Sequence, residues 1–193
     1  MIGLIILFAF CVYLTISVFV VLWTVRWARR TGRGVKRWAF AAAFAMYLLV
    51  FWDHIPTLLF YKYYCANKAG FWVYKTPEQW KKENPGVAET LTWKSNSPTC
   101  DKPDGTLGLR LNERFVWEKK YKDSSVLPVT LSVESVIDVE SGEIMVKRII
   151  VSSGYTGGMA YIRFWAAQKP YIPNTKEFAY YKKAFKKMGR EIQ

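Results

Sequence analysis

The stretch VFWDHIPTLLFYKYYC (residues 50–65) decides the fold, because it places polar residues inside sequence that is otherwise apolar enough for a membrane. Asp53 lies beside His54, the only histidine among the 193 residues, and Pro56 follows two positions later. A proline lacks the backbone donor, and its ring clashes with the carbonyl four residues earlier, so Pro56 predicts a kinked helix.

Two interpretations of this polar cluster are open. An ionisable residue within a membrane span is costly and by default a functional candidate, so Asp53 or His54 could dock another membrane subunit or relay a proton. Alternatively, Asp53, His54 and Pro56 form a kink at the outer interface, where the two ionisable side chains bond to water, headgroups or the first helix. The choice depends on which side of a bilayer the rest of the chain occupies.

Two apolar runs predict two transmembrane helices. Residues 2–23 hold no charge, and Asp53 is the only formal charge in residues 38–61. Each run exceeds the roughly 20 residues that a helix needs to cross a bilayer. We therefore expect membrane helices over residues 1–24 and 38–61, the second kinked near Pro56. A cleaved signal peptide is not expected, because no basic residue precedes the first run and the run is too long.

The connector between the two runs, residues 25–37, sets the predicted topology. It holds six basic residues and no acid, which is typical of a short cytoplasmic loop. Both termini, and a domain formed by residues 62–193, are then expected in the periplasm, on the outer side of a bacterial inner membrane. The six topology residues are Arg26, Arg29, Arg30, Arg33, Lys36 and Arg37.

The expected exported domain is basic, as is the whole chain with its formal net charge of +13. A basic surface favours anionic phospholipid, envelope polymers or an acidic protein as partner. Nucleic acid is not expected as a partner if the domain is periplasmic.

Two cysteines, Cys65 and Cys100, fall in the expected exported domain, and Cys11 falls in the first apolar run. An oxidising compartment favours a disulfide between Cys65 and Cys100. Two unpaired thiols are the alternative, because spacing does not show that the sulfur atoms meet. No metal site and no cofactor are expected, since the only histidine lies at the membrane and the chain has no C-x-x-C spacing.

The exported domain is predicted to be a small α+β domain. Three stretches have the character of β-strands, and a hairpin turn at Glu140–Gly142 joins the second to the third. They predict an antiparallel β-meander. Thr76 followed by Pro77 predicts the start of a short helix. Residues 159–167 could form a fourth strand or a short helix, which a run of this length does not distinguish. The three strands are expected in residues 113–121, 130–139 and 143–153.

The tail, residues 174–193, predicts an amphipathic helix with an aromatic stripe that includes Phe178 and Phe185. Such a helix could lie on anionic lipid, or it could pack its stripe on the sheet and leave its cations in water. The cations that would contact lipid are Lys182, Lys183, Lys186, Lys187 and Arg190. The predicted fold class is thus a hairpin of two transmembrane helices, followed by an α+β domain that ends in this helix.

YYCANKAGFWVYKT (residues 63–76) resembles a group of short bacterial exported or membrane-anchored proteins. They carry a Cys, an Ala-Gly or Gly-Gly pair and a VYxT segment, then a (T/S)GE hairpin and a Gly-Gly pair. DVESGEIMVKR (residues 138–148) and YTGG (residues 155–158) match the later features. The resemblance covers roughly residues 60–160, and this chain departs from it by having two apolar runs instead of one. It supports the domain boundary and the hairpin and implies no activity.

No motif for catalysis stands out: the sequence has no G-x-S-x-G, H-E-x-x-H or P-loop pattern. We therefore expect a non-enzymatic accessory, assembly or exclusion factor of the inner membrane, whose periplasmic domain binds another envelope protein subunit or complex. Homo-oligomers fit the same expectation. One alternative is a module that binds anionic lipid or an envelope polymer. The other is an enzyme that works without histidine, through carboxylates such as Asp101, Glu140 and Glu143.

Overall fold

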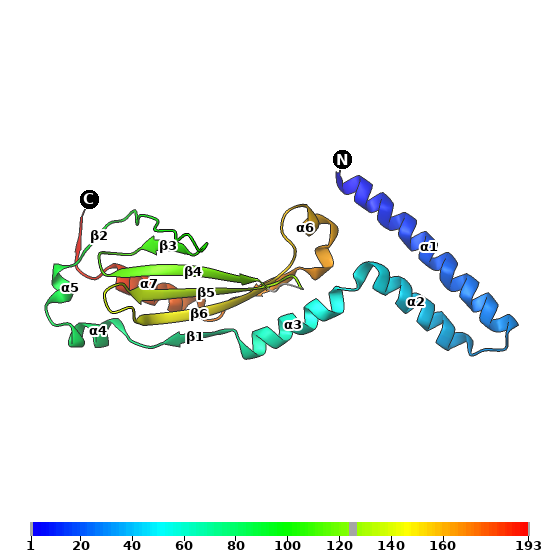
Figure 1. Cartoon of the computed structure of the whole chain (residues 1–193), viewed down its shortest axis with the longest axis horizontal. Helices are drawn as coiled ribbons and strands as arrows, with labels where there is room; N and C mark the ends of the chain where they lie inside the picture. The colour runs from blue at the N-terminus through cyan, green and yellow to red at the C-terminus, as the bar shows by residue number, and fades with distance from the viewer. Residues whose placement is uncertain (1, 124–126, 193) are drawn as a thin grey trace.

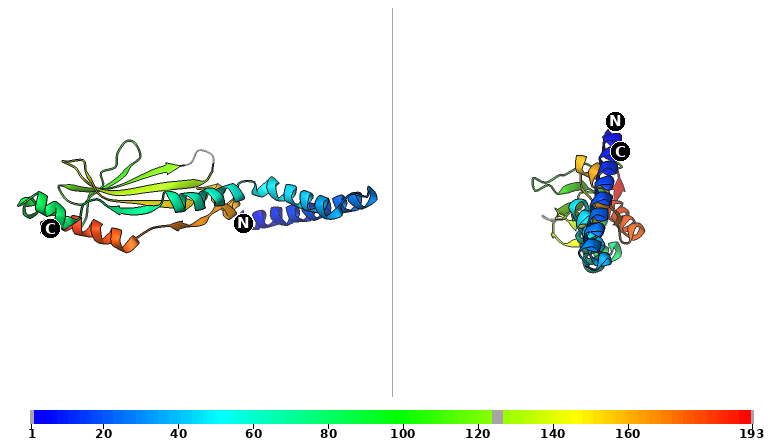
Figure 2. Two further views of the ribbon diagram at one scale, coloured as in Figure 1. Left: turned by 90° about the horizontal axis from the view of Figure 1, so that it is seen from below. Right: turned by 90° about the vertical axis from the view of Figure 1, so that its right-hand side faces the viewer.

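The computed structural model describes residues 2–123 and 127–192 and has two parts (Figure 1). Two long helices at the N-terminal end form a hairpin, and the C-terminal part is a β-sheet with helices packed on it. A third helix joins the two parts. The molecule is elongated, and it is narrow when viewed along its long axis (Figure 2).

Helix α1 (Ile2–Arg30) is long and apolar enough to cross a membrane. Helix α2 (Val35–Phe51) passes the same test only together with helix α3 (His54–Asn67), from which it is bent by 67°. Every residue of α2 is at least partly exposed, although its sequence is apolar. The fold therefore begins with a long apolar helix that is followed by further helices.

Aromatic contacts close both ends of the α1–α2 hairpin. At the turn, the rings of Trp27 and Trp38 meet edge to face at 5.2 Å, and the guanidinium of Arg33 lies over both. At the other end, the rings of Phe10 and Phe51 meet edge to face at 6.3 Å. The end of α2 is therefore level with Phe10, and the first residues of α1 extend beyond it.

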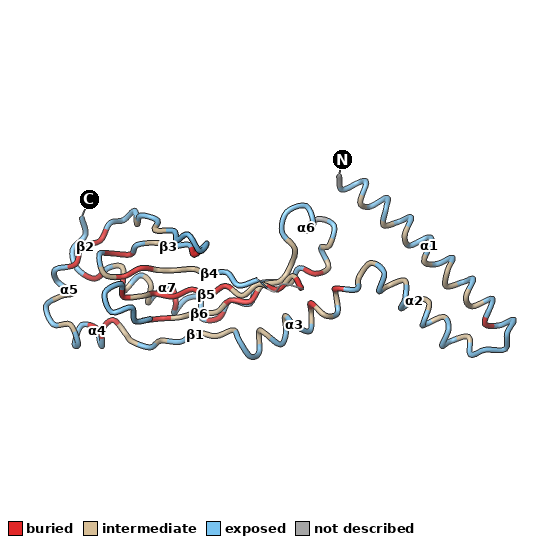
Figure 3. Tube along the Cα trace, viewed as in Figure 1, coloured by how far each residue is buried: buried red, intermediate tan, exposed pale blue. Residues whose placement is uncertain are grey.

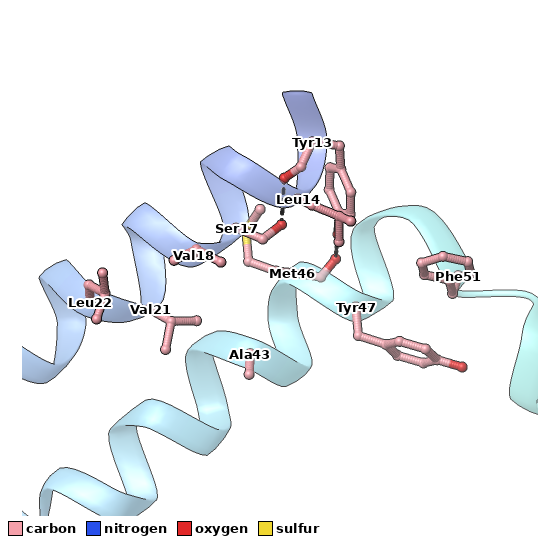
Figure 4. Close-up of a pocket in the computed structure, with 10 residues that line it drawn as sticks. All are labelled: Tyr13, Leu14, Ser17, Val18, Val21, Leu22, Ala43, Met46, Tyr47 and Phe51. Atoms are coloured by element: carbon pink, nitrogen blue, oxygen red, sulfur yellow. Dashed lines mark hydrogen bonds between the residues drawn. The ribbon is translucent and has the colours of Figure 1, made fainter. Parts of the chain in front are cut away.

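A groove of about 360 Å³ lies between the two helices (Figure 4). Its lining is mostly apolar and includes the small residues Ser17 and Ala43. The hydroxyl of Tyr13 bridges the helices by donating to the carbonyl of Met46. The two helices alone do not fill this groove.

The second apolar run, expected to be a helix over residues 38–61 that is kinked near Pro56, is divided into α2 and α3, which meet at a bend of 67°. Helix α3 begins at His54, so the break lies at Trp52 and Asp53. Pro56 is the third residue of α3, where a missing backbone donor costs little because the first turn has no intrahelical acceptor. Its ring disturbs the carbonyl of Trp52 instead, so the bend lies just before the proline.

The predicted antiparallel meander is confirmed: β4, β5 and β6 pair in chain order. They are the central strands of an antiparallel sheet with the order β1-β6-β5-β4-β3, and β7 pairs with the same edge of β6 as β1. The strands are β1 (Gly70–Val73), β3 (Leu107–Arg110), β4 (Phe115–Asp123), β5 (Val129–Asp138), β6 (Ile144–Ser153) and β7 (Gln168–Tyr171). A second, parallel pair joins β2 (Thr92–Trp93) to β8 (Arg190–Glu191).

The domain also contains short helices. Thr76 caps α4 (Pro77–Glu83) in a reciprocal capping box with Gln79, as its sequence predicts. The stretch 159–167 forms no fourth strand: residues 159–162 belong to helix α6, and residues 164–166 form the short 3-10 helix η1. The remaining bounds are α5 (Val87–Thr90), α6 (Gly158–Ile162), η1 (Phe164–Ala166) and α7 (Thr175–Lys186).

Helices pack on both faces of the main sheet, and most of the buried residues lie in this part of the chain (Figure 3). On one face, Phe178 and Phe185 of α7 pack into a core with Phe115 and Val136. On the other face, α3 packs against a smaller cluster that includes Val129. Val129 and Val136 point to opposite faces because side chains alternate along a strand. The aromatic stripe of the tail helix therefore packs on the sheet, which decides between its two predicted environments.

The predicted disulfide is contradicted, because Cys65 and Cys100 are both free thiols. Cys65 lies on α3 and contacts the cluster on β5 and β6. The backbone of Cys100 pairs with Gly108 of β3, at the outer edge of the sheet. Strand β4 separates the two positions, whereas a disulfide needs Cβ atoms within about 4.5 Å.

Candidate functional site

The most distinctive polar site is a carboxylate at the break between α2 and α3. The side chain of Asp53 is fully buried. It accepts hydrogen bonds from the hydroxyl of Tyr155 at 2.6 Å, from Nε1 of Trp165 at 3.0 Å and from a guanidinium nitrogen of Arg163 at 3.1 Å. We call these four side chains the Asp53 network.

All three donors come from the connection between β6 and β7, residues 154–167. Two glycines with positive φ angles, Gly154 at 127° and Gly157 at 63°, allow the chain to turn back on itself. Ser153 closes the base of this loop by donating from its hydroxyl to the carbonyl of Ala166 at 3.0 Å. The loop thereby brings residues far along the chain to the helix break.

The donor types fix the charge state of the site. Arginine and tryptophan side chains have only donors, so both oxygens of Asp53 act as acceptors, as in an ionised carboxylate. The guanidinium of Arg163 compensates the buried charge and also donates to the hydroxyl of Tyr155 at 3.0 Å. Burial and the adjacent carboxylate raise the pKa of Tyr155, which therefore stays a phenol donor. The site is therefore an ion pair whose acid is fully buried and hydrogen-bonded, while its arginine is partly exposed.

Aromatic rings surround the Asp53 network. The ring of Trp165 meets Phe51, the last residue of α2, edge to face at 4.5 Å. The guanidinium of Arg163 lies 5.9 Å from the ring centre of Trp52 and 5.1 Å from that of Tyr155. The β6–β7 loop thus contacts the end of α2 through apolar groups as well as through hydrogen bonds.

His54, the other ionisable candidate of the sequence, is oriented differently. Its Nδ1 lies 2.7 Å from the hydroxyl of Tyr47, on the last turns of α2. The side chains that do contact Asp53 include Arg163 and Trp165, which keep their protons throughout the physiological pH range. This set of partners favours a structural anchor over the proton relay considered from the sequence.

The predicted lipid-binding cations are dispersed. Lys182 lies 3.7 Å from the ring centre of Trp117, and burial lowers its pKa. Lys186 donates to the carbonyl of Ser95 at 2.8 Å, and Lys187 lies over the ring of Trp93. Lys183 and Arg190 are exposed. Because the aromatic stripe beside them is in the core, these cations lack the apolar face that an interfacial helix needs.

The carboxylates considered for catalysis have structural partners. Asp101 accepts from the backbone of Gly108 at 3.0 Å, Glu140 pairs with Arg114, and Glu143 pairs with Lys75 at 2.7 Å. In residues 2–123 and 127–192, no three His, Cys, Asp or Glu side chains are grouped so that they could hold a metal ion. The arrangement of these acids is that of turns and surface ion pairs.

A second buried acid, Asp138, repeats the chemistry of Asp53. It accepts from Nε1 of Trp80 at 3.0 Å and from Nε of Arg114 at 2.7 Å. Burial alone would raise the pKa of Asp138, but these hydrogen bonds outweigh burial and hold it below its usual value. Asp138 thereby connects helix α4 to the end of strand β5. In the same way, Asp53 connects the β6–β7 loop to the end of the α1–α2 hairpin.

Sequence reasoning selected Asp53 but missed its three partners. One signal was present: Arg163 is the only charged residue in residues 154–168, a segment that also holds Tyr155 and Trp165. A lone arginine in such a segment suggests a buried acid elsewhere, yet the sequence does not say which acid.

Comparison of the chain with family models, with curated proteins and with solved structures gives no match. The resemblance to short bacterial exported proteins therefore stays a prediction. Function has to be inferred from the site and from the surfaces of the molecule.

Proposed function

We propose that this chain is a non-enzymatic protein of a bacterial inner membrane. In this proposal the α1–α2 hairpin crosses the membrane with its turn in the cytoplasm, and the α+β domain binds another envelope protein in the periplasm as an accessory, assembly or exclusion factor. The observation that carries the proposal is the network around the fully buried Asp53, which fixes the domain to the hairpin with side chains suited to holding a position.

The surface of the hairpin supports a membrane location. Large apolar side chains along α1 are mostly exposed, with Leu4 at 75% and Phe19 at 70%. Burying such a surface in lipid removes a cost of roughly 25 cal/mol for each Å² of apolar area. The basic residues gather at the turn, beyond the apolar part of both helices, as the positive-inside rule requires of a cytoplasmic loop.

The rigid attachment of the domain to the hairpin supports a role in which the domain is held in a fixed position for a binding partner. A flexible linker would let the domain tumble, whereas α3 packs on the sheet and the loop grips the end of α2. A partner would therefore meet the domain in one orientation and at one height above the membrane. Fixing the orientation in advance lowers the entropy cost of docking.

Reporter fusions test the topology. An enzyme that is active only after export should be active when fused to the C-terminus and inactive when inserted at Gly32 in the turn. A cytosolic reporter should give the reverse pattern. A silent exported reporter at the C-terminus would overturn the periplasmic assignment and, with it, the proposed class of partner.

Affinity purification from native membranes, with crosslinking in cells, tests the binding role. We expect a specific envelope protein to be recovered with the wild-type chain and to be depleted with a chain that lacks residues 68–193. A chain that runs alone in mild detergent and crosslinks to no protein would contradict the proposal.

A second candidate, binding of an anionic envelope polymer, is favoured by one feature. Lys81, Lys187 and Arg190 line a hollow of about 560 Å³, with Glu89 as its acid. The hollow lies at the end of the domain away from the hairpin (Figure 1), where a polymer is easier to reach than membrane lipid. Salt-sensitive binding of an anionic polymer that is lost in Lys187→Glu would support this candidate. Binding that does not change with salt would contradict it.

A further inference from the structure

We propose that helix α3 and the β6–β7 loop lie in the outer leaflet of the membrane. Each has an exposed apolar patch beside the hairpin, and lipid covers both patches. The inference rests on the proposed membrane crossing of α1 and α2, and it adds a lipid-facing surface on the domain itself. The α3 patch consists of Ile55, Leu59, Phe60 and Tyr63. The loop patch consists of Met159, Ile162 and Phe164.

The α3 patch lies on the side of the helix that the sheet leaves open. Leu59 is 61% exposed and Tyr63 is 57% exposed, and the four members follow helical spacing along one side. The opposite side of α3 supplies Tyr61, Tyr64 and Cys65 to the cluster on the sheet. Helix α3 is therefore apolar on both sides, but only one side has a partner within the described part of the chain.

The loop patch is displayed by the Asp53 network. Arg163 and Trp165 point inward to Asp53, and they alternate with Ile162 and Phe164, which are 51% and 61% exposed. The inward side chains hold the loop in place, so the apolar side chains between them stay outside. The exposure of this patch is thus a consequence of the same contacts that fix the domain to the hairpin.

The depth of the helix break indicates that lipid covers both patches. Phe51 contacts Phe10, which lies eight residues after Ile2 and therefore about 12 Å along α1. Helix α6 lies beside this projecting end of α1 in both orientations (Figures 1 and 2). When residues 2–23 cross the membrane, as proposed above, Phe10 lies within the bilayer, and the break and the loop lie at the level of the outer leaflet.

The length of α2 leads to the same depth. Its uncharged part, residues 38–51, covers about 21 Å, whereas the hydrocarbon layer is about 30 Å thick. With α2 placed along the membrane normal, the bend of 67° turns α3 closer to the plane of the membrane than to the normal. In this orientation, the α3 patch can lie along the outer leaflet and complete the crossing.

Charge supports lipid as the occupant over a second protein. Residues 54–67 and 154–167 contain no acid, so nothing in either segment repels an anionic headgroup. Exposed lysines, Lys62 on α3 and Lys169 after the loop, can reach headgroups while their stems stay along the apolar surface. The ring of Trp52, at the break that separates the hairpin from α3, is also exposed.

Spin labels on the full chain in phosphatidylethanolamine–phosphatidylglycerol vesicles test the inference. Single cysteines at Leu59 and Phe164 report on the patches, in a background with Cys11→Ser, Cys65→Ala and Cys100→Ser. A label at Phe19 serves as the reference for lipid, and a label at Tyr180, exposed on α7, serves as the reference for water. We expect the two patch labels to collide with oxygen and to be shielded from a water-soluble nickel complex, as the Phe19 label is.

The outcomes separate this inference from the proposed function. Patch labels that behave like Tyr180, while the Phe19 label is in lipid, would overturn the inference and leave the membrane hairpin intact. A Phe19 label exposed to nickel would overturn the hairpin as well. Spin–spin broadening at Leu59 that disappears on dilution with unlabelled chain would show that a second copy covers the α3 patch, and would also overturn the inference.

A photo-crosslinking amino acid placed at Leu59 or Phe164 in the native-cysteine chain gives an independent measurement if the cysteine-free background does not fold. Adducts of phospholipid mass at both positions, and none at Tyr180, are the expected result. Adducts with protein alone would count against lipid as the occupant.

Discussion

Nε1 of Trp165 lies 3.0 Å from Oδ1 of Asp53, although the two residues are 112 positions apart in the chain. This hydrogen bond joins a loop of the sheet domain to the break between two helices. Together with the hydrogen bonds from Tyr155 and Arg163 to the same carboxylate, it fixes the position of the loop at the end of α2.

Asp53→Asn should destabilise the full chain in detergent by about 2–4 kcal/mol. The amide keeps the size of the side chain but leaves the guanidinium of Arg163 without its counter-charge and faces one donor with another donor. Thermal unfolding followed by near-UV circular dichroism measures the change. Asp104→Asn is the control, because that acid is exposed, its ion pair with Lys120 is in water, and the amide oxygen can still accept from the backbone of Thr106, so the melting temperature should fall much less. Equal shifts for the two variants would refute a special role for Asp53.

Trp165→Phe separates the hydrogen bond from the ring contact. Phenylalanine keeps an aromatic ring against Phe51 but removes the donor to Asp53, so we expect a loss of about 1–3 kcal/mol in the free energy of unfolding. Cleavage within residues 154–167 by a broad-specificity protease should also become faster. Trp72→Phe, at an exposed ring on β1, is the matched control and should not change either measurement.

Acid should weaken the domain through Asp138. Its pKa is lowered in the folded state relative to its usual value of 3.8, so the folded chain binds this proton less readily than the unfolded chain does. The stabilisation is complete above about pH 4 and is lost as pH falls through the lowered pKa. The free energy of unfolding should fall less steeply in this acid range for Asp138→Asn, although that variant is less stable at neutral pH. If the free energy of unfolding of the wild type and of Asp138→Asn fell equally steeply with pH, Asp138 would not be the source of the acid sensitivity.

Phe185→Ala tests where the tail helix packs. This ring is fully buried beside Phe115, so its truncation should cost about 3–5 kcal/mol in the free energy of unfolding. Tyr180→Ala, on the exposed side of α7, should change stability by less than about 0.5 kcal/mol. If α7 instead lay on lipid, vesicle binding would respond to Phe185→Ala while the stability of the domain would not.

Gly189→Ala should disrupt the small β2–β8 pair. At φ 87°, a Cβ atom at this position would lie 1.9 Å from the carbonyl oxygen of Leu91, which must then move. Gly142→Ala is a matched control, because its φ of 71° is also positive but open space surrounds the added atom. We expect only the backbone strain of about 1–2 kcal/mol at Gly142 and a clearly larger loss of stability at Gly189. Similar losses would show that steric contact with Leu91 is unimportant.

Local patterns predicted the elements that depend on neighbouring residues. The capped start of α4 and the meander of β4 to β6 follow from capping chemistry and from strand-forming sequence. The aromatic stripe of α7 predicted one buried side, but only the structure showed that the sheet covers Phe178 and Phe185.

Features that depend on residues far apart in the chain could not be predicted from local sequence patterns. The separation of Cys65 from Cys100 is set by which strands lie between them, and spacing carries no such information. The partners of Asp53 lie more than 100 positions away. The end of α2 at Phe51 also depends on them, because the loop stabilises the bend that Pro56 only favours.

The sequence separation within the Asp53 network has a consequence for synthesis. A ribosome adding about 5–20 residues per second needs about 6–22 s to extend the chain from Asp53 to Trp165. During this interval the acid is made but its partners are not. We expect nascent chains that stop before the loop to be recognised by membrane proteases, so that only a completed product is retained in the envelope.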